Sequence, residues 1–238
     1  MGRAGSNTIV ETEALILGRV VYGEADLIVQ VLTTRFGRIA ALARGARRNH
    51  KRFGGALEPM HTLKLELGEK PRGELYSLQG ASIEHARTRL TSHLEAMTTA
   101  GQALKWVKKS VPQNLSDSLI WQALTAFLDR LDQKEAQPFA SSHLASFGLN
   151  LLRVLGWGVN LSTCISCARS CPPNKNAWIH PERGGLVCRS CGGGPFQVSG
   201  ALRAELNDAQ QGSSLPLSSE AIAIATQIID RTLHTHVI

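Results

Sequence analysis

Four cysteines arranged as two identical pairs constrain the fold of this chain more than any other feature. Cys164 and Cys167 form the first pair, Cys188 and Cys191 form the second, and 20 residues separate the two pairs. Such pairs can place four thiolates at the corners of a tetrahedron around one Zn²⁺, with about 2.3 Å to each sulfur. Because four thiolates leave no position for water, the spacing predicts one structural zinc ion per chain and no metal catalysis.

Two other interpretations of the cysteines stay open. A redox Cys-x-x-Cys motif normally occurs once, beside a strand and at the start of a helix, whereas here the motif occurs twice in a segment rich in glycine and proline. The fifth cysteine, Cys171, and His180 lie close enough in sequence to replace a ligand. A free thiol is the simpler interpretation of Cys171, and no disulfide framework is expected without a secretory signal.

Positive charge is concentrated in two segments, residues 1–80 and residues 151–199. The sequence has 26 Lys and Arg against 19 Asp and Glu, a net charge of +7, and no acidic residue lies between Leu27 and Leu57. Seven Lys and Arg side chains lie within residues 35–52. Like charges at this density repel one another unless a polyanion neutralises them, and nucleic-acid phosphates do so while releasing counterions. A solvated loop is the alternative, although such loops usually mix signs. The predicted nucleic-acid contacts are Arg35, Arg38, Arg44, Arg47, Arg48, Lys51 and Arg52.

Four aromatic residues lie in the same region. Phe36 and Phe53 bracket the basic stretch. They suit base stacking beside cations and the core of a small barrel equally well, so both interpretations stay open. Tyr22 and Tyr76 are expected to be structural.

The first 81 residues have the hydrophobic pattern of short strands. Polar and apolar residues alternate strictly over 62–67, as in a half-buried strand with its leucines inward. Further apolar runs separated by turn residues cover 14–21, 26–33, 37–43 and 73–80. Five short strands in about 70 residues suit a small barrel such as an OB-fold. An SH3-like barrel fits the count almost as well, because periodicity does not give strand order.

After residue 82 the apolar spacing becomes helical. We therefore expect an α+β fold, with an N-terminal five-stranded OB-fold-like barrel in 1–81 and an all-helical domain in 82–238. The zinc insert would occupy about 160–196 of that domain. The predicted helices are one from about 83 to 107, one that begins near Ser116 or Asp117, one after Pro138 to about 155, one after Ser199, and one from 218 or 219 to about 234.

Motifs for nucleotide hydrolysis, metalloprotease chemistry, nucleophilic hydrolysis and hydride transfer are missing. Asp129 and Asp132 lie three residues apart on a predicted helix, where a solvated face is a better interpretation than a metal site. His85 and His93 are expected on the first helix. No apolar run approaches the ~20 residues of a membrane span and no signal peptide is visible, so a cytoplasmic protein is expected.

The order of these features is distinctive. A motif 22–26 reading Tyr-Gly-Glu-Ala-Asp is followed by Phe-Gly-Arg at 36–38, by Ala-Arg-Gly-Ala-Arg-Arg at 43–48 and by Arg-Phe-Gly-Gly-Ala-Leu-Glu-Pro at 52–59. A Gly-Gly-Leu-Val-Cys run at 184–188 precedes the last cysteine pair. With these motifs the chain resembles the RecO family of bacterial recombination mediators over nearly its whole length.

The resemblance implies an N-terminal OB-fold, a helical domain with a zinc site, and no enzyme activity. It also implies binding to single- and double-stranded DNA, annealing of complementary strands and cooperation with RecR. Single-strand-binding protein and RecA would be indirect partners, and the protein would associate with the nucleoid. Cys171 with Pro172 and Pro173 departs from the family pattern. The alternatives are a zinc-ribbon factor that binds RNA or a polymerase, or a zinc-dependent nuclease.

Overall fold

The computed structural model describes residues 9–48, 53, 55–68, 75–213 and 215–237. By their contacts, the residues form two compact units. Unit 1 comprises Met1–Met97 with Val111–Asp132, and unit 2 comprises Thr98–Ser110 with Gln133–Ile238. The expected domain boundary between residues 81 and 82 stays a prediction. None of the helices in these described ranges combines the length and apolar character that a membrane crossing requires.

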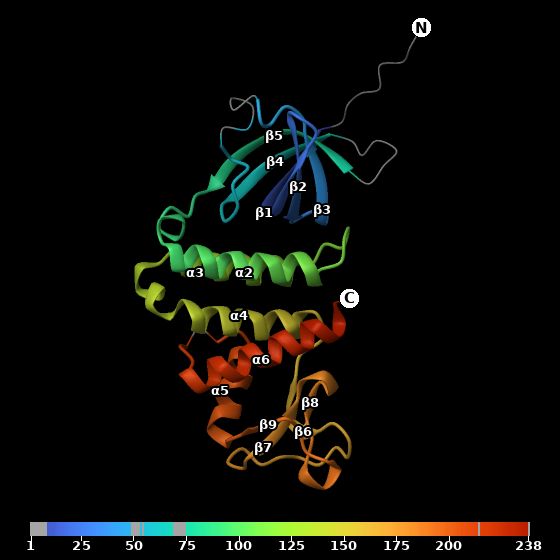
Figure 1. Ribbon diagram of the computed structural model, residues 1–238, viewed down its shortest axis with the longest axis vertical. Coiled ribbons are helices and arrows are strands. Elements are labelled where there is room, and N and C mark those ends of the chain that lie inside the picture. Colours follow the sequence, from blue (N-terminus) through green and yellow to red (C-terminus); the bar gives the residue numbers. More distant parts are fainter. Residues whose placement is uncertain (1–8, 49–52, 54, 69–74, 214, 238) are drawn as a thin grey trace. The chain divides into compact units, whose positions relative to one another are not determined.

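A closed five-stranded barrel forms most of unit 1 (Figure 1). Around the barrel the strands follow the order β1-β2-β3-β5-β4, and β4 closes it against β1. All neighbours are antiparallel except β3 and β5, which pair in parallel. This five-stranded Greek-key order is that of an OB-fold, so the predicted fold class is confirmed and the SH3-like alternative is wrong. The strands are β1 (Val10–Tyr22), β2 (Asp26–Thr33), β3 (Gly37–Ala43), β4 (Thr62–Gly68) and β5 (Leu75–His85).

The inward-facing side chains of the alternating strands fill the barrel. On β4, Leu63, Leu65 and Leu67 are buried while Lys64 and Glu66 are exposed, as the sequence pattern predicts. Full burial of one leucine contributes about 1.5–3 kcal/mol, so a one-residue slip of this strand would expose three of them at once. The register of β4 against both neighbours is therefore strongly determined.

The last barrel strand continues further than the sequence pattern indicates. The predicted helix start at Ile83 is wrong. Ile83 belongs to β5 and pairs with Leu63 on the neighbouring strand β4, and His85 pairs with Thr62 on the same strand. A short 3-10 turn, η1 (Leu90–Ser92), follows before α2 (Leu94–Ser110) begins. His85 therefore lies on a strand and does not share a helix with His93. Non-local strand pairing overrides the helical spacing here.

A segment after α2 packs on one end of the barrel within unit 1. Nε of Arg38 donates to the carbonyl of Val111 at 2.6 Å, and the Ser116 hydroxyl donates to the carbonyl of Thr34 at 2.8 Å. Gly37 has φ +66°, and a Cβ at this position would collide with the Leu115 carbonyl. A glycine is therefore needed where this segment crosses the hairpin between β2 and β3.

Helical starts in both units agree with the predicted caps. Oδ1 of Asp117 accepts from the N–H of Leu119 at 2.8 Å and begins α3. Ser199 and Ser218 cap α5 and α6 in the same way. In unit 2, α4 packs against both α5 and α6. The remaining helical elements are α3 (Ser118–Leu131), η2 (Lys134–Phe139), α4 (Ala140–Val154), α5 (Gly200–Gln210) and α6 (Ser219–His236).

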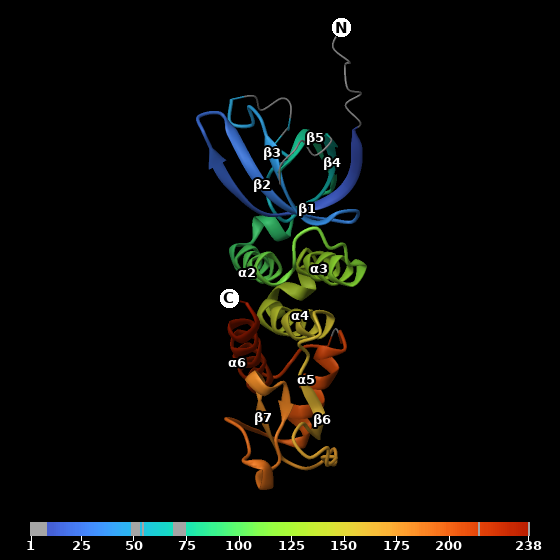
Figure 2. The ribbon, with the colours of Figure 1, turned by 90° about the vertical axis from the view of Figure 1, so that its right-hand side faces the viewer.

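The cysteine insert of unit 2 contains a small sheet that the sequence analysis did not predict. Its four strands follow the order β6-β8-β7-β9. Figure 2 shows two of them, β6 and β7. With two to five residues each, the four strands are too short for a periodic pattern to be visible. The elements are β6 (Asn160–Cys164), β7 (Ala177–His180), η3 (Pro181–Arg183), β8 (Gly185–Leu186), η4 (Arg189–Cys191) and β9 (Phe196–Val198).

Candidate nucleic-acid interface and metal centre

Three of the predicted cationic residues share one exposed turn directly after β3. Arg44, Arg47 and Arg48, which we call the arginine turn, all have exposed side chains. Gly45 adopts φ +70° and the N–H of Arg48 donates to its carbonyl at 3.0 Å, which closes the turn. The turn therefore gathers three exposed cationic side chains at one end of the barrel.

The loop between β1 and β2 holds the arginine turn in place. Oδ1 of Asp26 accepts from the N–H of Gly45 at 2.8 Å. Glu24 contributes twice, because its carbonyl accepts from Nη1 of Arg47 at 3.1 Å and its carboxylate pairs with Nη2 of Arg48 at 2.8 Å. In OB-folds the loop between the first two strands belongs to the surface that binds oligonucleotides. The arginine turn thus adjoins the surface where this fold binds its ligands.

The structure places Arg35 and Arg38 at the opposite end of β3. Arg38 is the second residue of this strand and Arg44 directly follows its last residue, so the two are six positions apart in extended chain, about 20 Å. Arg38 is partly buried, and burial lowers the pKa of its guanidinium. Arg35 is exposed and lies 5.5 Å from the ring of Phe36. The basic stretch therefore does not form a single patch.

Two predicted contacts, Lys51 and Arg52, lie outside the described residues. Phe53 beside them is 3% exposed and belongs to the barrel core. Phe36 packs on the same core and against Tyr76, with ring centroids 5.5 Å apart. Between the two open interpretations of Phe36 and Phe53, the structure therefore favours the core, and Tyr76 is structural as expected.

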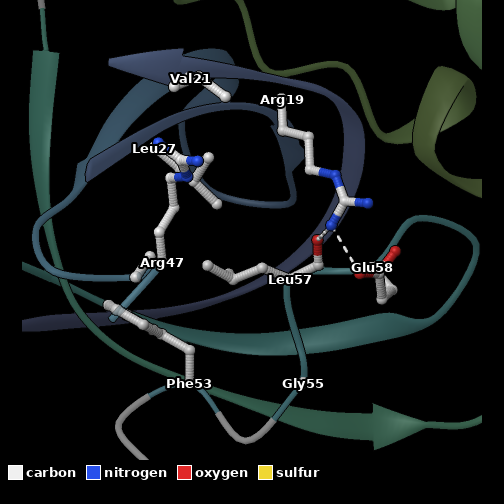
Figure 3. Close-up of a pocket in the computed structure, with 9 residues that line it drawn as sticks. Arg19, Val21, Leu27, Arg47, Phe53, Gly55, Leu57 and Glu58 are labelled. Atoms are coloured by element: carbon white, nitrogen blue, oxygen red, sulfur yellow. Dashed lines mark hydrogen bonds and ion pairs between the residues drawn. The ribbon is translucent and has the colours of Figure 1, made fainter. Parts of the chain in front are cut away.

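Two exposed residues near the end of β1, Arg19 and Tyr22, are not among the contacts predicted from the sequence. Tyr22, for which the sequence predicts a structural role, is 54% exposed beside the loop that holds the arginine turn. Arg19 lies on the same strand, and its Nη1 donates to Glu58 at 2.6 Å and to the carbonyl of Leu57 at 3.3 Å (Figure 3). The signal that could have identified Tyr22 is its position directly before a Gly-Glu turn, where a hairpin ends.

The four predicted thiols come together in the insert of unit 2. The sulfurs of Cys164, Cys167, Cys188 and Cys191 lie within 4.8 Å of one another, so the cluster can hold a metal ion. Cys167 and Cys188 have an Sγ–Sγ distance of 3.8 Å. A tetrahedron with metal–sulfur bonds of about 2.3 Å has edges of about 3.8 Å, so the thiols fit a zinc shell.

Neighbouring groups shift the pKa values of two of these thiols in opposite directions. The N–H of Cys188 donates to Sγ of Cys164 at 3.3 Å and lowers the pKa of the Cys164 thiol from 9.0 to about 6. Interaction with Cys188, and then with Cys167, raises the pKa of Cys191 to about 12. Four sulfurs this close cannot all ionise without a cation among them, which agrees with the chemistry of a metal centre.

The suggested replacement ligands do not join this cluster. Cys171 contacts the carbonyl of Pro172, at 3.9 Å from its sulfur. Nδ1 of His180 lies 3.0 Å from the carboxylate of Glu182, and Glu182 also pairs with Arg231 on α6 at 3.0 Å. In the described part of the chain the metal-binding group consists of the four paired cysteines.

Known proteins share this combination of units. A family model described as Recombination protein O N terminal matches residues 8–87, and one described as Recombination protein O C terminal matches residues 91–237. The chain is 35% identical to DNA repair protein RecO of Geobacter sulfurreducens over 183 residues, which cover 77% of this chain and 73% of that protein. It is 30% identical to DNA repair protein RecO of Myxococcus xanthus over 229 residues, covering 95% and 91%.

The fold and the four-cysteine cluster define a class of protein in which a basic OB barrel precedes a helical region with a four-thiol insert. Within that class, this chain belongs to the RecO family, because the two family models together span nearly all of it. The resemblance in the sequence motifs is therefore confirmed.

Proposed function

We propose that this protein is a DNA repair protein that binds DNA as a recombination mediator and works without catalysing a chemical step. It would anneal complementary strands and, together with RecR, help RecA to load on strands covered by single-strand-binding protein. The names of its relatives support a role in DNA repair. Such a protein would act in the cytoplasm, on the nucleoid.

The observation that carries this proposal is the arginine turn on the ligand-binding end of an OB barrel. Its three side chains are exposed, and Glu24 in the loop between β1 and β2 orients the guanidinium groups of Arg47 and Arg48. Annealing requires cations that shield two phosphate backbones while the base edges stay free, and contacts to phosphates provide this without sequence readout. Arg35 and Arg38 are proposed as further contacts at the other end of β3, and Lys51 and Arg52 as continuations of the basic stretch.

We propose Zn²⁺ as the ion of the four-cysteine cluster, with a structural role. Its four thiolates would fill the coordination shell, and the ion would hold together β6, β8 and the turn η4, which have few residues of their own to bury. Arg169 and Arg189, both exposed, flank the cluster and offset its negative charge.

The experiment that tests the function measures annealing of complementary DNA strands by the purified protein without ATP. We expect acceleration by the wild type and its loss in the Arg44→Ala, Arg47→Ala, Arg48→Ala triple variant. The matched control replaces three exposed cations elsewhere and removes the same charge: Arg89→Ala, Lys134→Ala and Lys175→Ala. Equal loss in both variants would contradict the assigned site, and acceleration with RNA strands but not with DNA would favour the RNA-binding alternative.

A further inference from the structure

A pocket of about 490 Å³ opens at the end of the barrel that carries the arginine turn. Its lining is largely apolar, with Val21 and Leu27 on one side and Phe53 and Leu57 opposite them (Figure 3). The volume lies within the range of about 300–1,000 Å³ that is typical of small-molecule sites. The pocket can therefore hold a small, mostly apolar group.

Two guanidinium groups border this apolar lining from opposite sides. Arg19 approaches from β1 and Arg47 from the arginine turn (Figure 3). Among the described residues, Nη1 of Arg19 makes the contacts to Leu57 and Glu58, and Nη1 of Arg47 donates to the carbonyl of Glu24. Within the described part of the chain, their other N–H groups have no hydrogen-bond partner and can donate to a ligand.

The chemistry of the pocket selects among the parts of a nucleic acid. A phosphate would lose its hydration against Leu27 and Leu57 and would meet the carboxylate of Glu58 at the rim. A nucleobase has apolar faces that suit the lining and polar edges that suit the guanidinium groups and Glu58. Guanidinium planes also stack on unpaired bases in proteins that bind single strands.

We propose that this pocket holds one unpaired nucleobase of a strand whose phosphates contact the arginine turn. The inference rests on the proposed function and identifies unpaired, single-stranded nucleic acid as the ligand of this site. A base inside a duplex is paired at its edge and stacked on both faces, so it cannot enter without being extruded. The pocket thus directs the barrel toward single strands, gaps and frayed ends.

A comparison of two oligonucleotides with equal charge tests the inference. One is a 12-nucleotide single strand, and the other has the same length with abasic sugars throughout. Binding of the full-length protein is followed by fluorescence anisotropy at constant salt. If one base is held, the intact strand should bind about fivefold more tightly or better, as one base-stacking interaction provides.

Neighbouring residues of β1 supply a matched pair of variants. Val21 lines the pocket, whereas Val20 lies next to it and points to the other face of the strand. The two side chains are similarly exposed, at 58% for Val21 and 52% for Val20. Val21→Glu should reduce the ratio of the two affinities to about one, because its carboxylate would pair with Arg19 and Arg47 inside the pocket. Val20→Glu adds the same charge and should keep the wild-type ratio. Arg19→Gln is a second variant that should lower this ratio without adding a negative charge.

The outcomes separate the two proposals. Equal affinity of the wild type for both oligonucleotides would overturn the base pocket and leave the backbone contacts standing. A wild-type ratio that persists in folded Val21→Glu and in Arg19→Gln would place the base elsewhere and also overturn the pocket. Failure to bind either oligonucleotide would instead contradict the proposed function.

Discussion

Nε of Arg87 donates a hydrogen bond of 2.7 Å to Oδ1 of Asp129, which joins the end of the barrel sheet to α3. Arg87 is only 1% exposed, and its Nη1 donates to the carbonyl of Met60 and the hydroxyl of Thr62. Asp132, the C-cap residue of α3, accepts from the N–H of Leu90 at 2.8 Å. The sequence assigns these two aspartates to a solvated face. In the structure they join the end of α3 to the segment that follows β5, within unit 1.

Removal of the carboxylate from this pair should destabilise unit 1. Asp129→Ala leaves the buried guanidinium of Arg87 without its counter-charge. Because the Asp129 side chain is itself 47% exposed, we expect the free energy of unfolding to fall by about 1–3 kcal/mol, less than for a fully buried pair. Urea unfolding of the full chain at neutral pH measures the change. The control is Glu24→Ala, which breaks an ion pair to Arg48 whose side chains are 67% and 89% exposed, and should cost less than about 1 kcal/mol. Similar losses in both variants would contradict the role of Arg87.

The pH dependence of stability should depend on His61. Nδ1 of His61 accepts from the backbone N–H of Arg87 at 3.0 Å, and burial, followed by the charge of Arg87, lowers the pKa of His61 below 6.5. Unfolded His61 binds a proton that folded His61 does not. Its contribution is therefore complete above about pH 6.5 and is lost as the pH falls through the lowered value.

The variant His61→Asn keeps an acceptor for Arg87 but does not titrate. Between about pH 7 and pH 5, the free energy of unfolding of the wild type should fall more steeply than that of this variant. Denaturant titrations at several pH values measure both slopes. Parallel profiles would show that His61 has the same pKa in both states.

The metal centre should make unit 2 dependent on zinc. We expect about one zinc ion per purified chain, and loss of the ion with a lower melting temperature in Cys188→Ser. Elemental analysis and thermal unfolding measure the two effects. Cys171→Ser is the matched control, because this thiol lies outside the cluster, and should retain the ion. Less than half an equivalent in the wild type, together with a disulfide detected by mass spectrometry, would favour the redox interpretation.

Salt titration of DNA binding should count the phosphate contacts of the arginine turn. Each contact removed lowers the slope of log K against log salt by about 0.7 for single strands, so Arg44→Ala, Arg47→Ala and Arg48→Ala together should flatten it by about two units. The loss should be similar for unrelated sequences, because phosphate contacts carry no base information. A wild-type slope in the triple variant would mean that the turn is only a solvated face.

DNA incubated with the protein and Mg²⁺ or Mn²⁺ should also remain intact while annealing proceeds, as expected for a non-catalytic mediator. Reproducible cleavage that a single Asp or Glu substitution abolishes would favour the nuclease alternative.

Local patterns in the sequence determined the strand faces, several helix starts and the cysteine cluster of this protein. Alternation over 62–67 gave the inward leucines of β4, and Asp117, Ser199 and Ser218 marked helix starts. The two cysteine pairs predicted the cluster, because each pair is itself a local turn and needs only one partner of the same kind. These features depend on neighbouring residues along the chain, which a sequence shows directly.

Tertiary structure alone decided which charges act together. Arg38 and Arg44 are close in sequence, but β3 carries them to opposite ends of the barrel because an extended strand advances about 3.3 Å per residue. Closure of the barrel buried Phe53 and left Tyr22 exposed, although both are aromatic residues of the same segment. Burial and proximity depend on contacts between residues far apart in the chain, and periodicity carries no information about those contacts.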